Sequence, residues 1–181
     1  MRVITGSARG RKLISPSGDD VRPTTDVVKE AVFSIIQFSV EGCSFLDAFA
    51  GSGQMGIEAV SRGASKVYMI DSSRRSMSVI KKNIALCGFE NKAVTVVNDT
   101  LTFLANTKER FDTVFLDPPY KTGLLQAALE KAVYVVNKGG CIICEHPREE
   151  ELPLEVGSFA VKKSYRYGQI VISVYVEKND C

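Results

Sequence analysis

The sequence predicts an α/β fold in which helices cover both faces of a mostly parallel sheet. Three observations support this prediction. Strand-like and helix-like segments alternate from residue 43 onward, turn residues follow several of the strands, and two closing strand-like segments meet at Gly168. Alternation requires crossover connections, which place helices against a parallel sheet. The closing pair is expected to form an antiparallel C-terminal hairpin.

Each element follows from its own spacing of apolar residues. The chain opens with a small hairpin around Gly6 and Gly10, and a helix follows after a polar loop. The expected helices are 25–38, 54–62, 74–87, 100–106 and 124–136, and the seven expected strands are 44–49, 66–70, 93–97, 113–116, 141–145, 159–167 and 169–177. We expect a basic arm and helix over residues 1–40, packed on a core over 41–181, in a single structural domain.

Composition narrows the class of protein. The 181 residues suit one domain, and 45% hydrophobic with 24% charged residues is ordinary for a globular protein. No apolar run reaches the roughly 20 residues of a membrane span, and residues 1–12 do not resemble a secretory signal, so a cytoplasmic location without membrane partners is expected. Five cysteines without regular spacing predict neither a disulfide scaffold nor a metal site.

Charge is unevenly distributed although the net charge is only +2. The first 18 residues contain no acidic residue, and their basic residues are Arg2, Arg9, Arg11 and Lys12. A phosphate-binding arm is one interpretation. A solvated terminal arm is the other.

A glycine-rich turn follows the first core strand and opens the next helix. It runs from Asp47 to Gly56, and its glycines have the spacing G-x-G-x-x-G, which also fits a dinucleotide-binding oxidoreductase. Such turns lie at the strand ends, where α/β sheets bind ligands. Asp47 would repel a pyrophosphate. It suits S-adenosylmethionine, which carries a positive sulfonium and a positive ammonium group.

Two more acids end the following strands. Asp71 ends the second strand, where a carboxylate can accept hydrogen bonds from both ribose hydroxyls of an adenosine. Asp99 ends the third strand and is placed to accept a hydrogen bond from an adenine amino group. The alternative is that these acids are ordinary loop residues.

The tetrapeptide Asp117-Pro118-Pro119-Tyr120 follows the apolar fourth strand. Both prolines fix φ at about −65°, so the loop is stiff. An exocyclic amine of a nucleobase is a poor nucleophile because its lone pair is delocalised. The Asp117 carboxylate and the Pro118 carbonyl can hold its N–H bonds, turn the lone pair toward a methyl group and stabilise developing positive charge. Tyr120 offers a stacking face for the base. The alternative is a rigid strand-to-helix turn.

These residues resemble the Rossmann-like class I methyltransferases and, more narrowly, the bacterial 16S ribosomal RNA (guanine-N2)-methyltransferase family. The Asp-Pro-Pro-Tyr sequence is shared with DNA adenine methyltransferases. The basic opening and the segment from Arg22 to Asp26 resemble the rRNA enzymes more specifically. The resemblance covers nearly the whole chain. The segments that carry it are 2–6, 9–13, 21–26, 47–53, 117–120 and 123–125, with Lys29, Glu30 and Phe33.

The resemblance implies methyl transfer from S-adenosyl-L-methionine to the N2 amine of a guanine in small-subunit rRNA. The implied catalytic residues are Asp117, Pro118, Pro119 and Tyr120. The implied cofactor-binding residues are Asp47, Phe49, Ala50, Gly51, Gly53, Asp71, Asp99 and Thr100. The predicted RNA-binding residues are Arg2, Arg9, Arg11, Lys12, Arg22, Thr24 and Thr25.

The chain departs from the family at two positions. Ser72 and Ser73 follow Asp71 where relatives often carry another charge, so ribose recognition is expected to rest on Asp71. Tyr120 replaces a common phenylalanine, and stacking survives that change.

Partners and rival functions follow from the same residues. A small enzyme without a target-recognition domain is expected to act as a monomer on rRNA within an assembled ribonucleoprotein, where a base must leave its stack. No cysteine lies in the site loops, which favours direct transfer without a covalent enzyme intermediate. The alternatives are a DNA adenine-N6 methyltransferase, a nucleotide-binding oxidoreductase and a non-catalytic RNA-binding module.

Other charged residues have more than one interpretation. His146, the only histidine, is expected to be a surface residue at a strand end, and a contact with substrate is the alternative. Basic residues of the helix 74–87 are expected to form a solvated face. Lys162, Lys163 and Arg166 either guard an exposed strand edge or extend an RNA surface.

Overall fold

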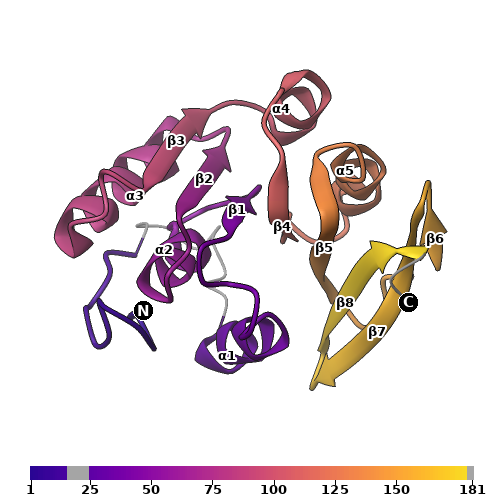
Figure 1. The fold of residues 1–181 in the computed structure, drawn as a ribbon, viewed down its shortest axis with the longest axis horizontal. Helices are drawn as coiled ribbons and strands as arrows, with labels where there is room; N and C mark the ends of the chain where they lie inside the picture. The colour runs from indigo at the N-terminus through magenta and orange to yellow at the C-terminus, as the bar shows by residue number, and fades with distance from the viewer. Residues whose placement is uncertain (16–24, 179–181) are drawn as a thin grey trace. The chain divides into compact units, whose positions relative to one another are not determined.

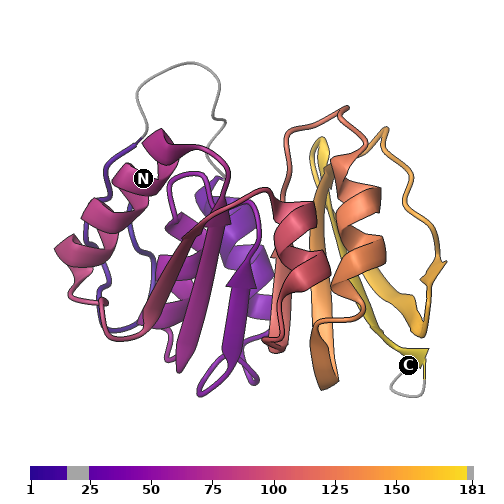
Figure 2. The same cartoon turned by 90° about the horizontal axis from the view of Figure 1, so that it is seen from above.

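The computed structural model describes residues 1–15 and 25–178. The chain divides into two compact units, Met1–Asp99 and Thr100–Cys181, whose elements are labelled in Figure 1 and seen from above in Figure 2. None of the helices in the described ranges combines the length and apolar character needed to cross a membrane.

The first unit alternates helices and strands in the order that the sequence predicts. Its elements are α1 (Asp26–Ile35), β1 (Ser44–Asp47), α2 (Gln54–Ser61), β2 (Lys66–Asp71), α3 (Arg74–Cys87) and β3 (Ala93–Val97). The strands are parallel in the order β3-β2-β1. Helix α2 packs on β1 and β2, α3 packs on β2 and β3, and the two helices contact each other. Right-handed crossovers that run in one direction account for this arrangement.

Apolar side chains fill the first unit, where consecutive residues of β1 and β2 are buried. Phe45, Leu46, Ile57, Met69 and Ile70 are fully buried. The rings of Phe33 on α1 and Phe45 on β1 stack with their centroids 6.1 Å apart. Complete burial of such side chains stabilises the fold by about 1.5–3 kcal/mol each.

The second unit combines a parallel strand pair with an antiparallel end. Its elements are α4 (Thr100–Asn106), β4 (Phe111–Leu116), α5 (Leu124–Ala132), β5 (Val136–Pro147), β6 (Glu155–Val156), β7 (Phe159–Tyr167) and β8 (Ile170–Glu177). Their strand order is β4-β5-β8-β7-β6. Strands β4 and β5 are parallel, and β8, β7 and β6 add antiparallel pairs. The predicted C-terminal hairpin is therefore confirmed.

Several predicted elements differ at their ends from those in the structure. The helix 25–38 ends at Ile35, and the helix 124–136 ends at Ala132. Val136 is instead the first residue of β5, where it pairs with Phe111 of β4. The Phe111 N–H also donates to the Val135 carbonyl at 2.8 Å. Pairing between strands thus overrides the helical spacing of the apolar residues. The two-residue strand β6 was not predicted.

The predicted N-terminal hairpin is reduced to one antiparallel bridge between Arg2 and Lys12. Its backbone is closed by hydrogen bonds from Val3 N to the Arg11 carbonyl at 2.9 Å and from Gly10 N to the Val3 carbonyl at 2.9 Å. Residues 1–14 therefore form a compact loop with little regular strand.

Candidate active site

The turn between β1 and α2 depends on its glycines. Gly51 and Gly53 have φ of 54° and 77°, and Gly53 is the left-handed N-cap of α2. A Cβ on Gly53 would lie 3.2 Å from two carbons of the Ile80 side chain on α3. A Cβ on Gly56 would lie 2.7 Å from the terminal methyl carbon of Met69. The turn thus needs glycine for its backbone conformation and for close packing on β2 and α3.

Asp47 is the buried acid of this turn. It ends β1, is 1% exposed, and accepts a hydrogen bond from Gly56 N at 3.0 Å through Oδ2. Burial raises the pKa of Asp47 to about 7, and the negative charge of Asp71 raises it further, whereas the Gly56 hydrogen bond lowers it. A bound cation would offset this burial cost. Phe49 is half-buried and Ala50 is buried in the same turn.

Asp71 holds the turn from the end of β2. Its Oδ2 accepts from Gly51 N at 2.8 Å and its Oδ1 accepts from Ser73 N at 2.8 Å. A carboxylate has about four lone-pair positions, so Asp71 can accept further hydrogen bonds. Ser73 also caps α3, because its hydroxyl accepts from Ser76 N at 3.2 Å. Ser73 of the Ser72-Ser73 pair is therefore the N-cap of α3.

The last two predicted cofactor-binding residues follow β3. Asp99 is exposed, and Thr100 is buried as the first residue of α4. Their contacts with an adenosine stay predictions.

The loop after β4 carries the four predicted catalytic residues. Asp117 and Tyr120 are half-buried, Pro118 is buried and Pro119 is exposed. The Thr122 hydroxyl donates to the Pro119 carbonyl at 2.7 Å, and Lys121 has φ of 61°, which is uncommon for a residue other than glycine. The loop is therefore held in a defined, locally strained conformation.

Glu145 is a residue of this site that the sequence analysis missed. It lies on β5, is 4% exposed, and accepts a hydrogen bond from the Tyr120 hydroxyl at 3.2 Å through Oε1. Leu116, directly before the loop, pairs with Cys144, directly before Glu145. The sequence signal for Glu145 was its position near the end of the strand that follows β4 and runs parallel to it. Its bond to Tyr120 fixes the ring whose face is predicted to stack on a base.

The basic arm has its backbone docked on α2. The N–H groups of Ile4 and Thr5 donate to the Glu58 carboxylate at 2.8 and 2.9 Å. A Cβ on Gly6 would lie 1.8 Å from the Ser61 carbonyl oxygen, so the arm and the helix are in direct contact. A free solvated arm does not describe residues 1–14.

Glu58 is also the centre of a buried charge cluster. Arg62 Nε lies 2.8 Å and Lys29 Nζ 3.9 Å from its carboxylate oxygens, and Lys29 Nζ donates to the Arg2 carbonyl at 2.6 Å. Burial lowers the pKa of Lys29, and the Glu58 charge opposes that shift. The cluster ties the arm to α1 and α2.

The predicted RNA-binding side chains remain on the surface. Arg9, Arg11 and Lys12 are exposed, and Arg2 Nε lies 3.5 Å from the Asp26 carboxylate in an exposed ion pair. Thr25 caps α1 by accepting from Val28 N at 3.4 Å. Arg22 and Thr24 lie outside the described residues.

The prediction that His146 is a surface residue is wrong. His146 is 5% exposed, its Nε2 lies 2.9 Å from the Ser173 hydroxyl and its Nδ1 lies 3.1 Å from the Pro147 carbonyl. Strand β8 lies beside it, where His146 pairs with Val171 in the antiparallel ladder. Its environment is a buried polar network within the sheet.

The cysteines of β5 are buried thiols. Burial raises the pKa of Cys141 to about 11 and that of Cys144 still higher. Within residues 1–15 and 25–178, no group of three or more histidine, cysteine, aspartate or glutamate side chains is arranged to hold a metal ion.

The family model described as "Conserved hypothetical protein 95" matches residues 1–176. The chain belongs to this family. It is 37% identical over 183 residues to "Putative rRNA methyltransferase YlbH" of Bacillus subtilis, with 98% of this chain and 100% of the relative covered. It is 33% identical over 178 residues to "Ribosomal RNA small subunit methyltransferase D" of Escherichia coli K12, covering 97% and 89%.

A solved structure gives the same assignment of fold. "Putative methyltransferase yhhF from Escherichia coli" matches with a TM-score of 0.88 and 30% identity, covering 98% of this chain and 97% of that one. The resemblance and the α/β methyltransferase fold predicted from the sequence are therefore confirmed for this member of the family.

Proposed function

We propose that the chain transfers the methyl group of S-adenosyl-L-methionine to the exocyclic N2 amine of a guanine in small-subunit (16S) rRNA. The observation that carries this proposal is the stiff loop from Asp117 to Tyr120, whose aromatic ring is fixed by the buried Glu145. Relatives over nearly the full length are named as rRNA methyltransferases, which supports RNA as the substrate.

The side chains of the first unit fit a cofactor that carries positive charge and a ribose. Asp47 is a buried carboxylate whose pKa is raised by burial and by the neighbouring Asp71, so a cation at this turn is stabilising. Asp71 is oriented by Gly51 N and Ser73 N and can still accept hydrogen bonds from ribose hydroxyls. When bound, S-adenosyl-L-methionine supplies an electrophilic methyl group on its sulfonium.

The loop of the second unit fits an exocyclic amine. The Asp117 carboxylate and the Pro118 carbonyl are acceptors, so they can hold the two N–H bonds of the amine and orient its lone pair. Asp117 or a water molecule accepts the proton that the nitrogen releases. Stacking on Tyr120 contributes about 1–3 kcal/mol of binding for the base.

The proposed substrate is rRNA in an assembled small subunit. The exposed cations of the docked arm can bind phosphates at fixed positions. A chain without a separate recognition domain can rely on the shape of a ribonucleoprotein to present one unstacked guanine. Naked 16S rRNA is therefore expected to be a much poorer substrate.

Methyl transfer to three substrates tests the proposal. The purified protein is incubated with tritiated S-adenosyl-L-methionine and small subunits from a strain lacking its own homologue, naked 16S rRNA, or duplex DNA. We expect label in small subunits, and nucleoside mass spectrometry should identify N2-methylguanosine. Label in N6-methyladenosine of DNA, or no transfer to any substrate, contradicts the proposal.

A pair of variants assigns the chemistry to the loop. Asp117→Ala should lower kcat by at least about 100-fold, because it removes an acceptor of the amine. Glu149→Gln removes an exposed carboxylate of the same unit and should leave the rate unchanged. Unchanged methylation by Asp117→Ala would show that the loop is not the catalytic site.

A further inference from the structure

A pocket lies between α3 and the end of β3. Its volume is about 440 Å³, and it is lined by Arg74, Met77, Ser78, Lys81 and Val97. The first four residues lie on α3 and Val97 ends β3, so the pocket is contained in the first unit. Their spacing of three, four and seven residues places the helical members on one face.

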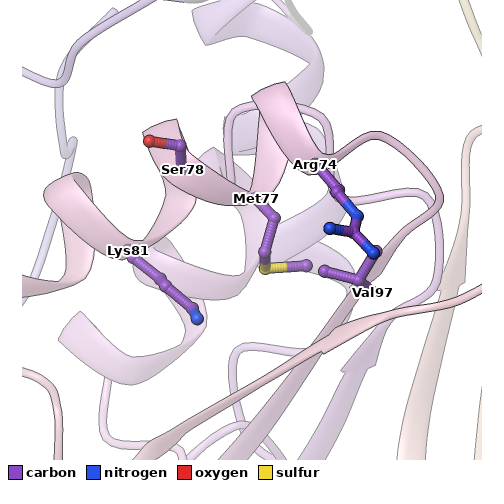
Figure 3. Close-up of a pocket in the computed structure, with 5 residues that line it drawn as sticks. All are labelled: Arg74, Met77, Ser78, Lys81 and Val97. Atoms are coloured by element: carbon purple, nitrogen blue, oxygen red, sulfur yellow. The ribbon is translucent and has the colours of Figure 1, made fainter.

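The pocket combines two cations with an apolar floor. Arg74 and Lys81 are exposed, and within the described residues neither forms an ion pair. They are two turns apart on α3, about 10 Å along its axis. Val97 is 47% exposed although it is apolar. Figure 3 shows the Arg74 guanidinium and the Met77 side chain reaching toward Val97, with Lys81 further along the helix.

This combination fits a nucleotide of single-stranded RNA. Two exposed cations attract phosphates, and a guanidinium plane above an apolar surface is a common stacking site for an unpaired base. A flat apolar partner would not need the two charges, and a free anion would not need the exposed valine. The two features together favour a ligand with both a backbone charge and a flat face.

The pocket lies next to the acids that are proposed to bind the adenosine. Arg74 follows Asp71 by three residues, and Val97 precedes Asp99 by two. The Asp71 charge is partly satisfied by the N–H groups of Gly51 and Ser73, which reduces its repulsion of a phosphate. An RNA strand that enters the proposed site can therefore cross this end of α3.

We propose that the pocket between α3 and the end of β3 binds a single-stranded nucleotide of the substrate rRNA, with Arg74 and Lys81 on its phosphates and Val97 under its base. This inference rests on the proposed function, because it assigns a second contact with the same RNA. It adds α3 to the RNA-binding residues predicted from the sequence in the N-terminal arm and at Arg22, Thr24 and Thr25.

Salt-dependent RNA binding tests the pocket. The probe is a fluorescein-labelled 12-nucleotide oligouridylate, measured by anisotropy at several KCl concentrations against wild type, Arg74→Ala, Lys81→Ala and the double variant. Each lost phosphate contact should lower the slope of log K against log salt by about 0.7. We expect the double variant to bind at least about tenfold more weakly and to show a raised KM for small subunits with little change in kcat.

Lys82→Ala is the matched control. Lys82 is an exposed lysine of the same helix that does not line the pocket, so this variant removes the same charge. Weakening by Lys82→Ala equal to that by Lys81→Ala would overturn the inference, because long-range charge would then explain both. Val97→Asp should weaken RNA binding further, since it places a carboxylate in the floor.

Binding of S-adenosylhomocysteine separates the pocket from the cofactor site. Its affinity, measured by calorimetry, should be unchanged in all of these variants. A loss of this affinity with unchanged RNA binding would assign the pocket to the cofactor and overturn the inference. If wild type methylates small subunits while the double variant binds RNA normally, only the inference fails. If wild type neither binds nor methylates RNA, the proposed function fails as well.

Discussion

Asp47 combines two properties that oppose each other in a folded protein, since it is ionisable and 1% exposed. Its pKa is raised from 3.8 to about 7, chiefly by burial. Between these two values the native state holds a proton that the unfolded chain has released. Stability contributed by this residue is therefore present at acid pH, falls as the pH rises toward about 7, and changes little above it.

Asp47→Asn should therefore be more stable than wild type at pH 8 and nearly equal to it at pH 4. Asparagine can still accept from Gly56 N but carries no charge to bury. The gain is on the order of 2–4 kcal/mol, seen as a higher Tm. The same variant should lose at least about tenfold in S-adenosylhomocysteine affinity, because it lacks the carboxylate that is proposed to pair with the ammonium group of the ligand. A variant that is no more stable at pH 8, measured by thermal unfolding over this pH range, contradicts the role of burial.

The hydrogen bond between Tyr120 and Glu145 is the second feature of single residues that leads to a prediction. The hydroxyl donates to a buried carboxylate at 3.2 Å, which fixes the ring. Tyr120→Phe keeps the stacking face and loses the bond, so we expect a small rise in KM, about two- to fivefold, by loss of one hydrogen bond. Tyr120→Ala removes the face and should raise KM or lower kcat by a further tenfold or more. Equal kinetics for Phe and Ala at this position would exclude stacking.

At the scale of elements, spacing in the sequence predicts most of the helices and strands. The bounds of α3, β3, α4 and β7 agree with the prediction, because each lies between clear turn residues and has regular apolar spacing. The helix predicted over 124–136 ends earlier, at Ala132, because Val136 pairs with Phe111 of β4. Local pattern cannot reveal a partner that is distant in the sequence.

The candidate site was predictable to the same extent. Asp47, Asp71 and the loop from Asp117 follow strands directly, so the sequence locates them at strand ends. Glu145 and His146 lie inside β5, and their partners Tyr120 and Ser173 lie 25 and 27 residues away. Such contacts depend on register across the sheet, which composition and periodicity do not determine.

The arm shows how an element can depend on one glycine. Gly6→Ala would place a Cβ 1.8 Å from the Ser61 carbonyl oxygen, at φ of 86°. We expect a loss of about 3 kcal/mol or more in the free energy of unfolding, or a detached arm. Gly10→Ala is the control, because φ there is 81° but no atom lies within 4 Å of the added Cβ. It should lose only about 1 kcal/mol. Equal losses in urea unfolding would show that contact with α2 is unimportant.

At the scale of the whole molecule, the chain is predicted to be one structural domain although it divides into units Met1–Asp99 and Thr100–Cys181. The family match across residues 1–176 includes both units. The proposed chemistry also needs residues from each: the acids of the first unit and the loop of the second. If the chain is one structural domain, as the sequence predicts, its two units are expected to unfold cooperatively.

Calorimetry tests this expectation. One transition should appear, with equal calorimetric and van't Hoff enthalpies. S-adenosylhomocysteine at 100 times its Kd should stabilise the native state by about 2.7 kcal/mol and raise the single Tm by about 5–10 °C. Asp47→Asn provides the control, because a tenfold weaker affinity should reduce the stabilisation to about 1.4 kcal/mol and roughly halve the shift of its single Tm. Two transitions, of which only one responds to the ligand, would mean that the units fold independently. The ligand would then stabilise the first unit without coupling it to the loop at Asp117.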